Sequence, residues 1–521
     1  MSLAQTGSTT CDHDVVIIGG GLSGLCAGVK LGEDGFDYLI LERDGGLGGA
    51  WWANRYPGVG VDVMSIVYSF SFFTNPDWSR TFPGGSELAS YAKRLADAYD
   101  MNDRIRLNAN VSRCDYDADA CIWTTTLIGG ERITSRYLIG AWGILTNPKK
   151  PQLPGLDEFR GRVIHTAEWP EDGDLTGENV AVIGTGASAV QMVPAIAPKV
   201  KQLNVFQRTA IWVLPRPDVR MPRMVQKLFR RVPAVERAVR YAGWVFTDSF
   251  LVHAIVHPKP LWLLVRAIEA TCHVFLRLSV RDPQRRAALT PDYEFGCKRP
   301  TMSNTYYRTY NRPNVDLITA PIQRITADGV ATADGREYAT DTLVLSTGFR
   351  LWEPGGTPPL PIYGATGREL GEQWAEEGYG TYEGIAMPGY PNLFFACWAP
   401  YALTGASYLL MVETHVKKIQ RVLGAARARR SAEVSVREQA YTRWAGKMRK
   451  GGFNTAAFQP NCGNARSYYI DHNGDAPLIR PQSTQSMWAS AQRRSLIDDF
   501  EFQPARAAQP VARHDGAPAS A

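Results

Sequence analysis

The sequence lacks the features that would place the chain in a membrane or direct it out of the cell. Its 521 residues contain no run of 18 uncharged apolar residues, so we expect no membrane-spanning helix. The first 14 residues are polar and lack the apolar segment of a secretory signal. These absences predict a cytoplasmic protein.

Cysteine and histidine are scarce, with eight of each. The cysteines form no CxxC or CxxxxC pair, which argues against a disulfide reductase, and their scatter predicts free thiols in a reducing compartment. No histidines are paired at the spacing of metal ligands, and no GxSxG motif occurs, so neither a metal site nor a serine hydrolase is expected.

The excess of positive charge is small and local. The net charge is +6, and residues 216–240 alone hold eight Arg or Lys against two acids. The rest of the chain is near neutral, which excludes a general nucleic-acid binder.

A glycine-rich turn follows a short apolar strand near the N-terminus. After DVVIIG at 14–19, Gly19, Gly21 and Gly24 open a helix that we expect to run to about residue 31. Glycines at this spacing allow a tight turn and let the backbone approach a pyrophosphate. The next strand ends at Glu42, followed by Arg43, and a carboxylate there accepts the ribose hydroxyls of an adenosine. This unit predicts a dinucleotide site.

A second unit of the same kind begins at residue 179. The strand NVAVIG leads into the turn GTGASA at 184–189, and the second strand ends in Gln207-Arg208 instead of an acid. A carboxylate at that position would repel a 2′-phosphate, whereas a guanidinium can bind it bidentately. We therefore predict that this unit binds NADPH, with Arg208 and Thr209 near the phosphate. The turn residues expected at the cofactor are Gly184, Gly186 and Ser188.

Two further segments match longer patterns. The segment FRGRVIHTAEWP at 159–170 fits F-x-G-x-x-x-H-x-x-x-W-P, and GGAWWANRYPGVGVD at 48–62 fits [AG]-G-x-W-x-x-x-x-[FY]-P-[GM]-x-x-x-D. Both are signatures of type I Baeyer–Villiger monooxygenases, and the chain resembles that family over about residues 14–423. The residues singled out from these patterns are Phe159, Gly161, His165 and Trp169 from the first and Gly49, Trp51 and Asp62 from the second.

The resemblance implies a fold, two cofactors and a reaction. The fold is α/β, with two Rossmann-like dinucleotide-binding domains, for FAD and NADPH, and a helical insertion. In the family NADPH reduces FAD, O2 adds at flavin C4a, and the resulting peroxyflavin attacks a ketone to give an ester or lactone. A small-molecule ketone and O2 are therefore the expected partners.

The resemblance also assigns roles to individual residues. Arg299 matches the active-site arginine that holds the peroxide deprotonated and stabilises the oxyanion, and Asp62 matches the carboxylate that orients it. Lys298 and Arg208 match positions at the NADPH phosphate. His165 is assigned to coupling domain rotation with NADP binding, at a distance from the flavin.

The predicted domains alternate along the chain. The FAD domain takes residues 1–150 and 341–502, the NADPH domain 151–215 and 291–340, the helical insertion 216–290, and a disordered tail 503–521. The segment 340–349 is interpreted as the strand that returns the chain to the first domain, and its Thr347 and Gly348 are expected at a cofactor. A helix is expected over 87–99, with Ser86 as its N-cap.

The insertion has more than one interpretation. Its first helical stretch has apolar residues at helical spacing, Arg and Lys on its other face and a break at Pro233, and its second, at about 259–280, is richly apolar. Basic amphipathic helices can rest on an anionic membrane surface, cover an apolar substrate tunnel, or pack on the NADPH domain with a solvated basic face. The insertion and the segment 467–483 differ from the cycloalkanone-oxidising members, which favours an apolar linear or bulky ketone.

Other function classes stay open at this point. A related flavin monooxygenase oxidises nitrogen or sulfur, and there the hydroperoxide stays protonated and has less need of an arginine. A non-enzymatic, membrane-associated module built on 216–290 is a second alternative. The oligomeric state is left undetermined.

Overall fold

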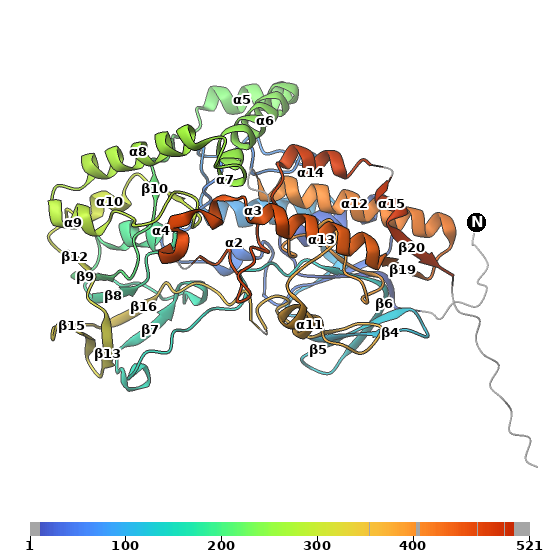
Figure 1. Cartoon of the computed structure of the whole chain (residues 1–521), viewed down its shortest axis with the longest axis horizontal. Helices are drawn as coiled ribbons and strands as arrows, with labels where there is room; N and C mark the ends of the chain where they lie inside the picture. Colours follow the sequence, from blue (N-terminus) through green and yellow to red (C-terminus); the bar gives the residue numbers. More distant parts are fainter. Residues whose placement is uncertain (1–10, 354, 403–406, 466, 494, 505–521) are drawn as a thin grey trace, which may run out of the picture.

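The fold comprises two sheet-centred units and a layer of helices above them, in the computed structural model of Figure 1. The structure describes residues 11–504 except 354, 403–406, 466 and 494. The predicted α/β class, with two Rossmann-like units and a helical insertion, is confirmed.

The first unit is built on an eight-stranded sheet around β1 (His13–Ile18). β1 pairs in parallel with β2 (Tyr38–Leu41) and β6 (Arg132–Gly140), so the turn after β1 opens at the carboxyl edge of the sheet. Val15, Val16 and Ile17 are fully buried, because a hydrophobic core lies on each face of this sheet. Its other strands are β3 (Ile105–Arg106), β4 (Val111–Asp117), β5 (Ile122–Leu127), β17 (Ile362–Tyr363) and β18 (Leu393–Phe395).

The core of the first unit includes residues of α1 (Leu22–Glu33), α3 (Gly85–Ala98) and α12 (Tyr408–Arg429). α3 begins at Gly85, with Gly84 in the cap position and no side-chain cap, so the predicted N-cap Ser86 is wrong. The helical spacing of apolar residues identified the helix, but Ser86 lies inside its first turn. The smaller helices α2 (Ala50–Ala53) and α11 (Leu370–Glu377) complete this part.

The second unit is a five-stranded, wholly parallel sheet in the order β12-β9-β8-β16-β7. Its strands are β7 (Arg162–His165), β8 (Asn179–Ile183), β9 (Gln202–Phe206), β12 (Val315–Ile318) and β16 (Thr342–Leu345). α4 (Ala187–Ile196) and α10 (Tyr306–Thr309) pack against it. A small antiparallel sheet follows β12 and consists of β13 (Ile322–Thr326), β14 (Gly329–Thr332) and β15 (Glu337–Ala339).

The boundary expected after residue 340 is corrected by β16. This strand pairs with β7 on one side and β8 on the other, so residues 342–345 belong to the second sheet. The apolar run 342–345 fits a buried strand of either unit, and only its pairing decides between them. The chain returns to the first unit after β16, where Gly348 accepts a hydrogen bond from the backbone of Lys149 at 2.9 Å.

The insertion forms a helical layer that spans both units. It contains α5 (Arg223–Arg231), α6 (Pro233–Thr247), the short π-helical turn η4 (Asp248–Val252), α7 (His253–Val256), α8 (Trp262–Ser279) and α9 (Pro283–Ala288). Pro233 divides the first stretch, as predicted. The predicted packing on the NADPH unit describes only part of this layer, because Glu236 of α6 accepts a hydrogen bond from Thr74 of the first unit at 2.9 Å. α8 packs on the second unit through Leu276.

The C-terminal part folds back over the first unit. It contains β19 (Glu433–Val436), α13 (Glu438–Gly452), α14 (Thr484–Ser490), α15 (Ser495–Asp498) and β20 (Phe500–Gln503), and β19 pairs antiparallel with β20. Gln503, which was predicted to begin the disordered tail, is the last residue of β20. Residues 505–521 of that prediction lie outside the described residues.

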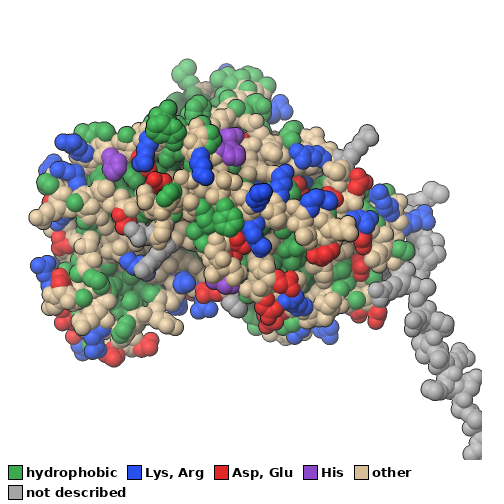
Figure 2. Space-filling model, in the orientation of Figure 1, with side chains coloured by type: hydrophobic (Ala, Val, Ile, Leu, Met, Phe, Trp, Pro, Cys, Tyr) green, Lys and Arg blue, Asp and Glu red, His purple; other side chains and the backbone are tan. Residues whose placement is uncertain are grey.

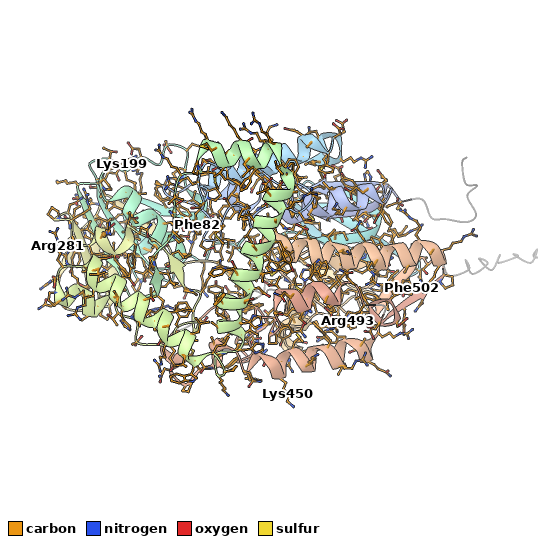
Figure 3. The ribbon with its side chains drawn as sticks, turned by 90° about the horizontal axis from the view of Figure 1, so that it is seen from above. Phe82, Lys199, Arg281, Lys450, Arg493 and Phe502 are labelled. Atoms are coloured by element: carbon orange, nitrogen blue, oxygen red, sulfur yellow. A yellow bond between two sulfur atoms is a disulfide. The ribbon has the colours of Figure 1, made fainter. Side chains whose placement is uncertain are left out.

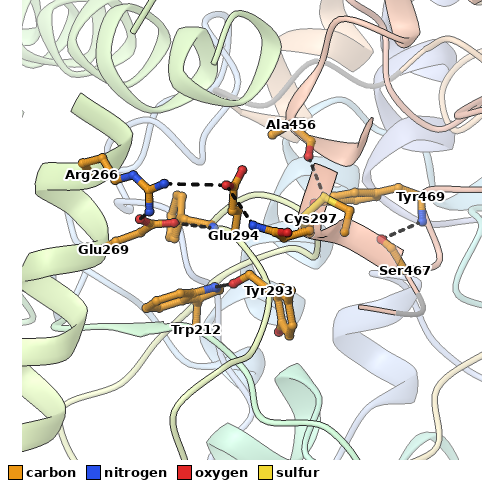
Figure 4. The surroundings of a disulfide bond; sticks show 12 residues. Trp212, Arg266, Glu269, Tyr293, Glu294, Cys297, Ala456, Ser467 and Tyr469 are labelled. Carbon is orange, nitrogen blue, oxygen red and sulfur yellow. Dashed lines mark hydrogen bonds and ion pairs between the residues drawn. A yellow bond between two sulfur atoms is a disulfide. The ribbon is translucent and has the colours of Figure 1, made fainter. Parts of the chain in front are cut away.

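The expectation of free thiols is wrong for two cysteines. Cys297 and Cys462 form a disulfide across 165 positions of sequence, shown in Figure 4. A spacing of that size carries no sequence signal, because only the fold brings the two residues together. No helix of the described residues has the length and apolar character needed to cross a membrane.

Candidate active site

A large cavity lies between the two units and is lined by residues of both glycine-rich turns. Its volume is about 1850 Å³, well above the roughly 300–1,000 Å³ of a pocket for one drug-sized ligand. All the predicted catalytic and cofactor residues line it except Gly24, so residues from distant parts of the sequence meet around one space.

Two backbone N–H groups, one of them from the first turn, donate hydrogen bonds to the carboxylate of Glu42. Gly20 donates to Oε2 at 2.6 Å and Asp44 to Oε1 at 2.9 Å. Burial raises the pKa of Glu42, and these two hydrogen bonds oppose that shift. Gly24 lies behind the turn, where a Cβ would come within 1.9 Å of the Gly19 carbonyl oxygen. Only glycine lets the helix and the turn approach so closely, which fits a pyrophosphate-binding turn.

The loop between 48 and 62 joins the two units. Tyr56 donates a hydrogen bond to Gln191 of α4 at 2.9 Å, and the Gln191 amide donates to the Gly60 carbonyl at 2.9 Å. Trp51 donates its indole N–H to the Tyr68 hydroxyl at 3.1 Å, and the two rings meet edge to face. The motif therefore ties the first unit to the nucleotide helix of the second.

In the second unit a glycine-rich turn and a cation that follows β9 both face the cavity. Gly184 has a φ of +107°, and a Cβ there would lie 2.3 Å from the Ser346 carbonyl oxygen. Gln207 donates its amide to the Ala288 carbonyl at 2.6 Å, whereas the neighbouring Arg208 is exposed in the cavity. Among the described residues no carboxylate forms an ion pair with Arg208, so its guanidinium is available to an anionic ligand. This arrangement fits a 2′-phosphate.

Arg299 and Asp62 form an ion pair in the cavity wall. The Nη2 of Arg299 lies 2.9 Å from Oδ1 and 3.0 Å from Oδ2 of Asp62, and its Nε lies 3.3 Å from Oδ2. The Asp62 charge raises the pKa of Arg299 further above its already high value. The two side chains are 40% and 24% exposed, and both residues line the cavity. The pair therefore presents a permanent cation of fixed orientation to anything bound there.

Two tyrosines beside this pair were missed by motif reasoning. Tyr468 and Tyr469 line the cavity, and burial raises the pKa of both phenols, a shift that the charge of Arg299 opposes. The indole N–H of Trp352 donates a hydrogen bond to the Tyr468 carbonyl at 2.7 Å. The only signal for them in the sequence is that the segment 467–483 departs from the cycloalkanone-oxidising pattern.

The residues of the 159–170 motif lie outside the cavity. His165 ends β7 and is buried, its Nδ1 accepts the Ala167 N–H at 3.1 Å, and its ring meets Phe349 edge to face. Burial lowers the pKa of His165, so the ring is held neutral. Trp169 lines a separate shallow cleft, Phe159 packs under the second sheet, and Gly161 passes close to the Asp341 carbonyl. His165 thus lies where the chain crosses between the two units.

The disulfide ties the arginine segment to the C-terminal segment. In the sequence, Cys297 stands two residues before Arg299, and Cys462 stands six residues before Tyr468. Cys297 is fully buried, and nearby Trp212 donates its indole N–H to the Tyr293 carbonyl at 3.0 Å. The bond therefore joins two segments that both line the cavity.

Comparison with known proteins places the chain in a family. A model described as pyridine nucleotide-disulphide oxidoreductase matches residues 16–236. A Baeyer-Villiger monooxygenase of Streptomyces coelicolor is 34% identical over 504 residues, which are 95% of this chain and 93% of that protein. A Baeyer-Villiger monooxygenase of Pseudomonas aeruginosa is 35% identical over 445 residues, 85% of this chain and 83% of that protein. The chain belongs to the Baeyer–Villiger monooxygenase family.

Solved structures agree with this assignment to the Baeyer–Villiger monooxygenases. An oxidized steroid monooxygenase bound to NADP matches with a TM-score of 0.83 at 29% identity, over 94% of this chain and 99% of that one. The enzyme OTEMO, in complex with FAD and NADP, matches with a TM-score of 0.84 at 26% identity, over 95% and 100%. The predicted family and its cofactors FAD and NADPH are confirmed, and the enzyme is an FAD-containing, NADPH-dependent monooxygenase.

Proposed function

We propose that this Baeyer–Villiger monooxygenase inserts oxygen beside the carbonyl of an apolar linear or bulky ketone, with Arg299 as its catalytic cation. The observation that carries the proposal is the Arg299–Asp62 ion pair in the wall of a cavity that both nucleotide turns reach. A small-molecule ketone and O2 are the partners of this reaction. An apolar ketone dissolves in lipid, so peripheral membrane contact through 216–290 belongs to the same proposal.

The residues that hold the cofactors divide between the two units. The first unit binds FAD through Gly19, Gly21, Gly24, Glu42, Arg43, Gly49 and Trp51. The second binds NADPH through Gly184, Gly186, Ser188, Arg208, Thr209 and Lys298, and Thr347 and Gly348 contact a cofactor where the chain crosses back. Bound FAD, once reduced by NADPH, supplies the activated oxygen taken from O2.

The chain itself supplies charge and orientation. Negative charge develops on the ketone oxygen as the reaction proceeds, and the Arg299 guanidinium stabilises it at no cost of reorientation, because Asp62 already holds three of its contacts. Asp62 is a positioning residue, since its contacts run through Arg299. Removing one such charge-stabilising group costs on the order of 10²–10³ in rate.

The cavity wall supports an apolar substrate. Near the insertion it is lined by aliphatic and aromatic side chains: Phe82, Leu214, Phe246, Phe250, Ile255 and Met302. A wall of this kind excludes water, which strengthens the charge interaction at Arg299 and prevents loss of the activated oxygen as hydrogen peroxide.

The test is Arg299→Ala, measured with a panel of linear, cyclic and aryl ketones. NADPH oxidation and FAD reduction are expected to persist, while the ester falls by on the order of 10²–10³ and hydrogen peroxide takes its place. Arg94→Ala, which removes an exposed cation of α3, is the matched control and should leave ester formation unchanged. Ester formed by Arg299→Ala at the unmutated rate would contradict the proposed role.

A further inference from the structure

The insertion concentrates exposed apolar side chains. Eleven of the nineteen large hydrophobic residues that are exposed in the described part of the chain lie within residues 224–278. Met224 is 83% exposed, Trp262 58% and Leu263 66%. Scattered exposed hydrophobics are ordinary, but a group on one helical layer marks an interaction surface. Figure 2 shows hydrophobic and basic side chains side by side at the top of the molecule, over α5 and α6.

The same layer is cationic on its outer side. Residues 216–290 contain fourteen Arg or Lys and five Asp or Glu. Glu236, Asp248 and Glu269 are buried, and the Asp218 carboxylate is turned inward against Arg80. The burial of these acids leaves the outward charge almost wholly positive. Four exposed cations of α5 and α6 form no ion pair with any described residue: Arg223, Lys227, Arg231 and Arg237.

The cavity reaches this layer. Phe246 and Phe250 line the cavity and are also more than half exposed, and their rings lie 4.9 Å apart between centroids. Side chains that face both the interior and the solvent stand at a rim. Figure 3, which looks down on this side, shows α6 crossing the middle of the molecule with the two nucleotide-binding units on either side. The apolar, basic layer therefore adjoins an opening of the catalytic cavity.

We propose that the outer face of α5, α6 and η4 docks on an anionic lipid bilayer and that an apolar ketone passes from the bilayer over the rim formed by Phe246 and Phe250 into the cavity. This inference rests on the proposed function, because a substrate can enter the cavity from the bilayer only if it is an apolar ketone that dissolves in lipid. Cations interleaved with exposed aromatic and aliphatic side chains match the headgroup region of an anionic membrane. None of the described helices is able to span a bilayer, so the contact is peripheral.

The test uses FAD-loaded full-length enzyme and vesicles of phosphatidylcholine with or without phosphatidylglycerol. Cosedimentation is expected with the anionic vesicles and not with the neutral ones, and high salt should release the protein. The variant R223E/K227E/R231E/R237E is expected to lose at least tenfold in vesicle affinity. The matched control, R94E/K199E/K201E/R312E, reverses four exposed cations away from this face and should bind as the unmutated enzyme does.

Activity separates this inference from the proposed function. The charge-reversed enzyme should oxidise a water-soluble ketone at the unmutated rate. It should oxidise a long-chain ketone presented in anionic vesicles more slowly than the unmutated enzyme does. Equal binding to neutral and anionic vesicles, equal loss in the control variant, or self-association without vesicles would overturn membrane docking. Vesicle binding by an enzyme that oxidises no ketone would leave docking intact and overturn the proposed reaction.

Discussion

Replacing Arg208 by alanine tests how the enzyme recognises NADPH. Arg208 follows β9 and faces the cavity. The side-chain amide of the preceding Gln207 donates a hydrogen bond to the Ala288 carbonyl of the insertion. A 2′-phosphate bound at the second turn therefore meets one guanidinium that no described carboxylate neutralises. The substitution should raise the KM for NADPH and leave the KM for NADH nearly unchanged.

The magnitude follows from the exposure of this cation. A hydrogen bond to a charged group contributes about 1.5–3 kcal/mol, and the side chain is accessible to water, so about 2 kcal/mol is a reasonable value for the phosphate contact. At about 1.4 kcal/mol for each factor of ten, the KM for NADPH should rise about 30-fold.

The assay compares initial rates of cofactor oxidation with NADPH and with NADH. Lys201→Ala removes an exposed cation just before β9 and is the control, since it lies away from the cavity. An equal rise in both KM values, or a rise for NADPH below about threefold, would show that the phosphate is recognised by other residues.

Three more outcomes follow from the structure. Gly24→Ala should yield colourless protein without FAD, measured by flavin absorbance, because a Cβ would lie 1.9 Å from the Gly19 carbonyl oxygen. Cys462→Ser should lower the Tm in calorimetry, since the chain-entropy model gives up to about 5 kcal/mol for a loop of 165 residues; an unchanged Tm would mean that the bond does not stabilise the fold. Burial and then the charge of Lys418 lower the pKa of His415 well below its usual value. The unfolded chain therefore gains a proton there as the pH falls below about 6.5, and the folded chain does not, so the free energy of unfolding declines by up to about 1.4 kcal/mol per pH unit. Urea denaturation at several pH values should show a shallower decline in the free energy of unfolding for His415→Gln. An identical slope would show that His415 is not the residue responsible for the decline.

The local features of this fold are those that the sequence predicts well. The turns after β1 and β8, the strand that ends before Glu42 and the break at Pro233 depend on neighbouring residues, so glycine spacing and apolar runs reveal them. The pairing of Arg299 with Asp62 spans 237 positions. Only the family resemblance indicated it, because no local physical rule links residues so far apart.

The errors share a cause. The apolar strand β16 fits either sheet, and its register beside His165 decides that it belongs to the second. Cys297 and Cys462 carry no mutual signal until the C-terminal segment folds over the cavity. Tyr468 lies on that same segment, so its position beside Arg299 was equally inaccessible from spacing. In each case the contact is between residues far apart in the sequence, so the local sequence is compatible with several arrangements and only the tertiary fold determines which one forms.

The insertion constrains how the two units can move. Arg240 of α6 donates hydrogen bonds to the Ser69 carbonyl and to Glu413 of the first unit, while Leu276 of α8 belongs to the core of the second. A rotation of one unit against the other must therefore bend this layer between α6 and α8, the region that carries Phe250 at the rim. A second connection between the units runs beside His165, where Pro148 pairs with Phe349 and the Phe349 ring meets His165 edge to face. Any rotation of one nucleotide site against the other must therefore also displace the rim, because the same helices contact both units.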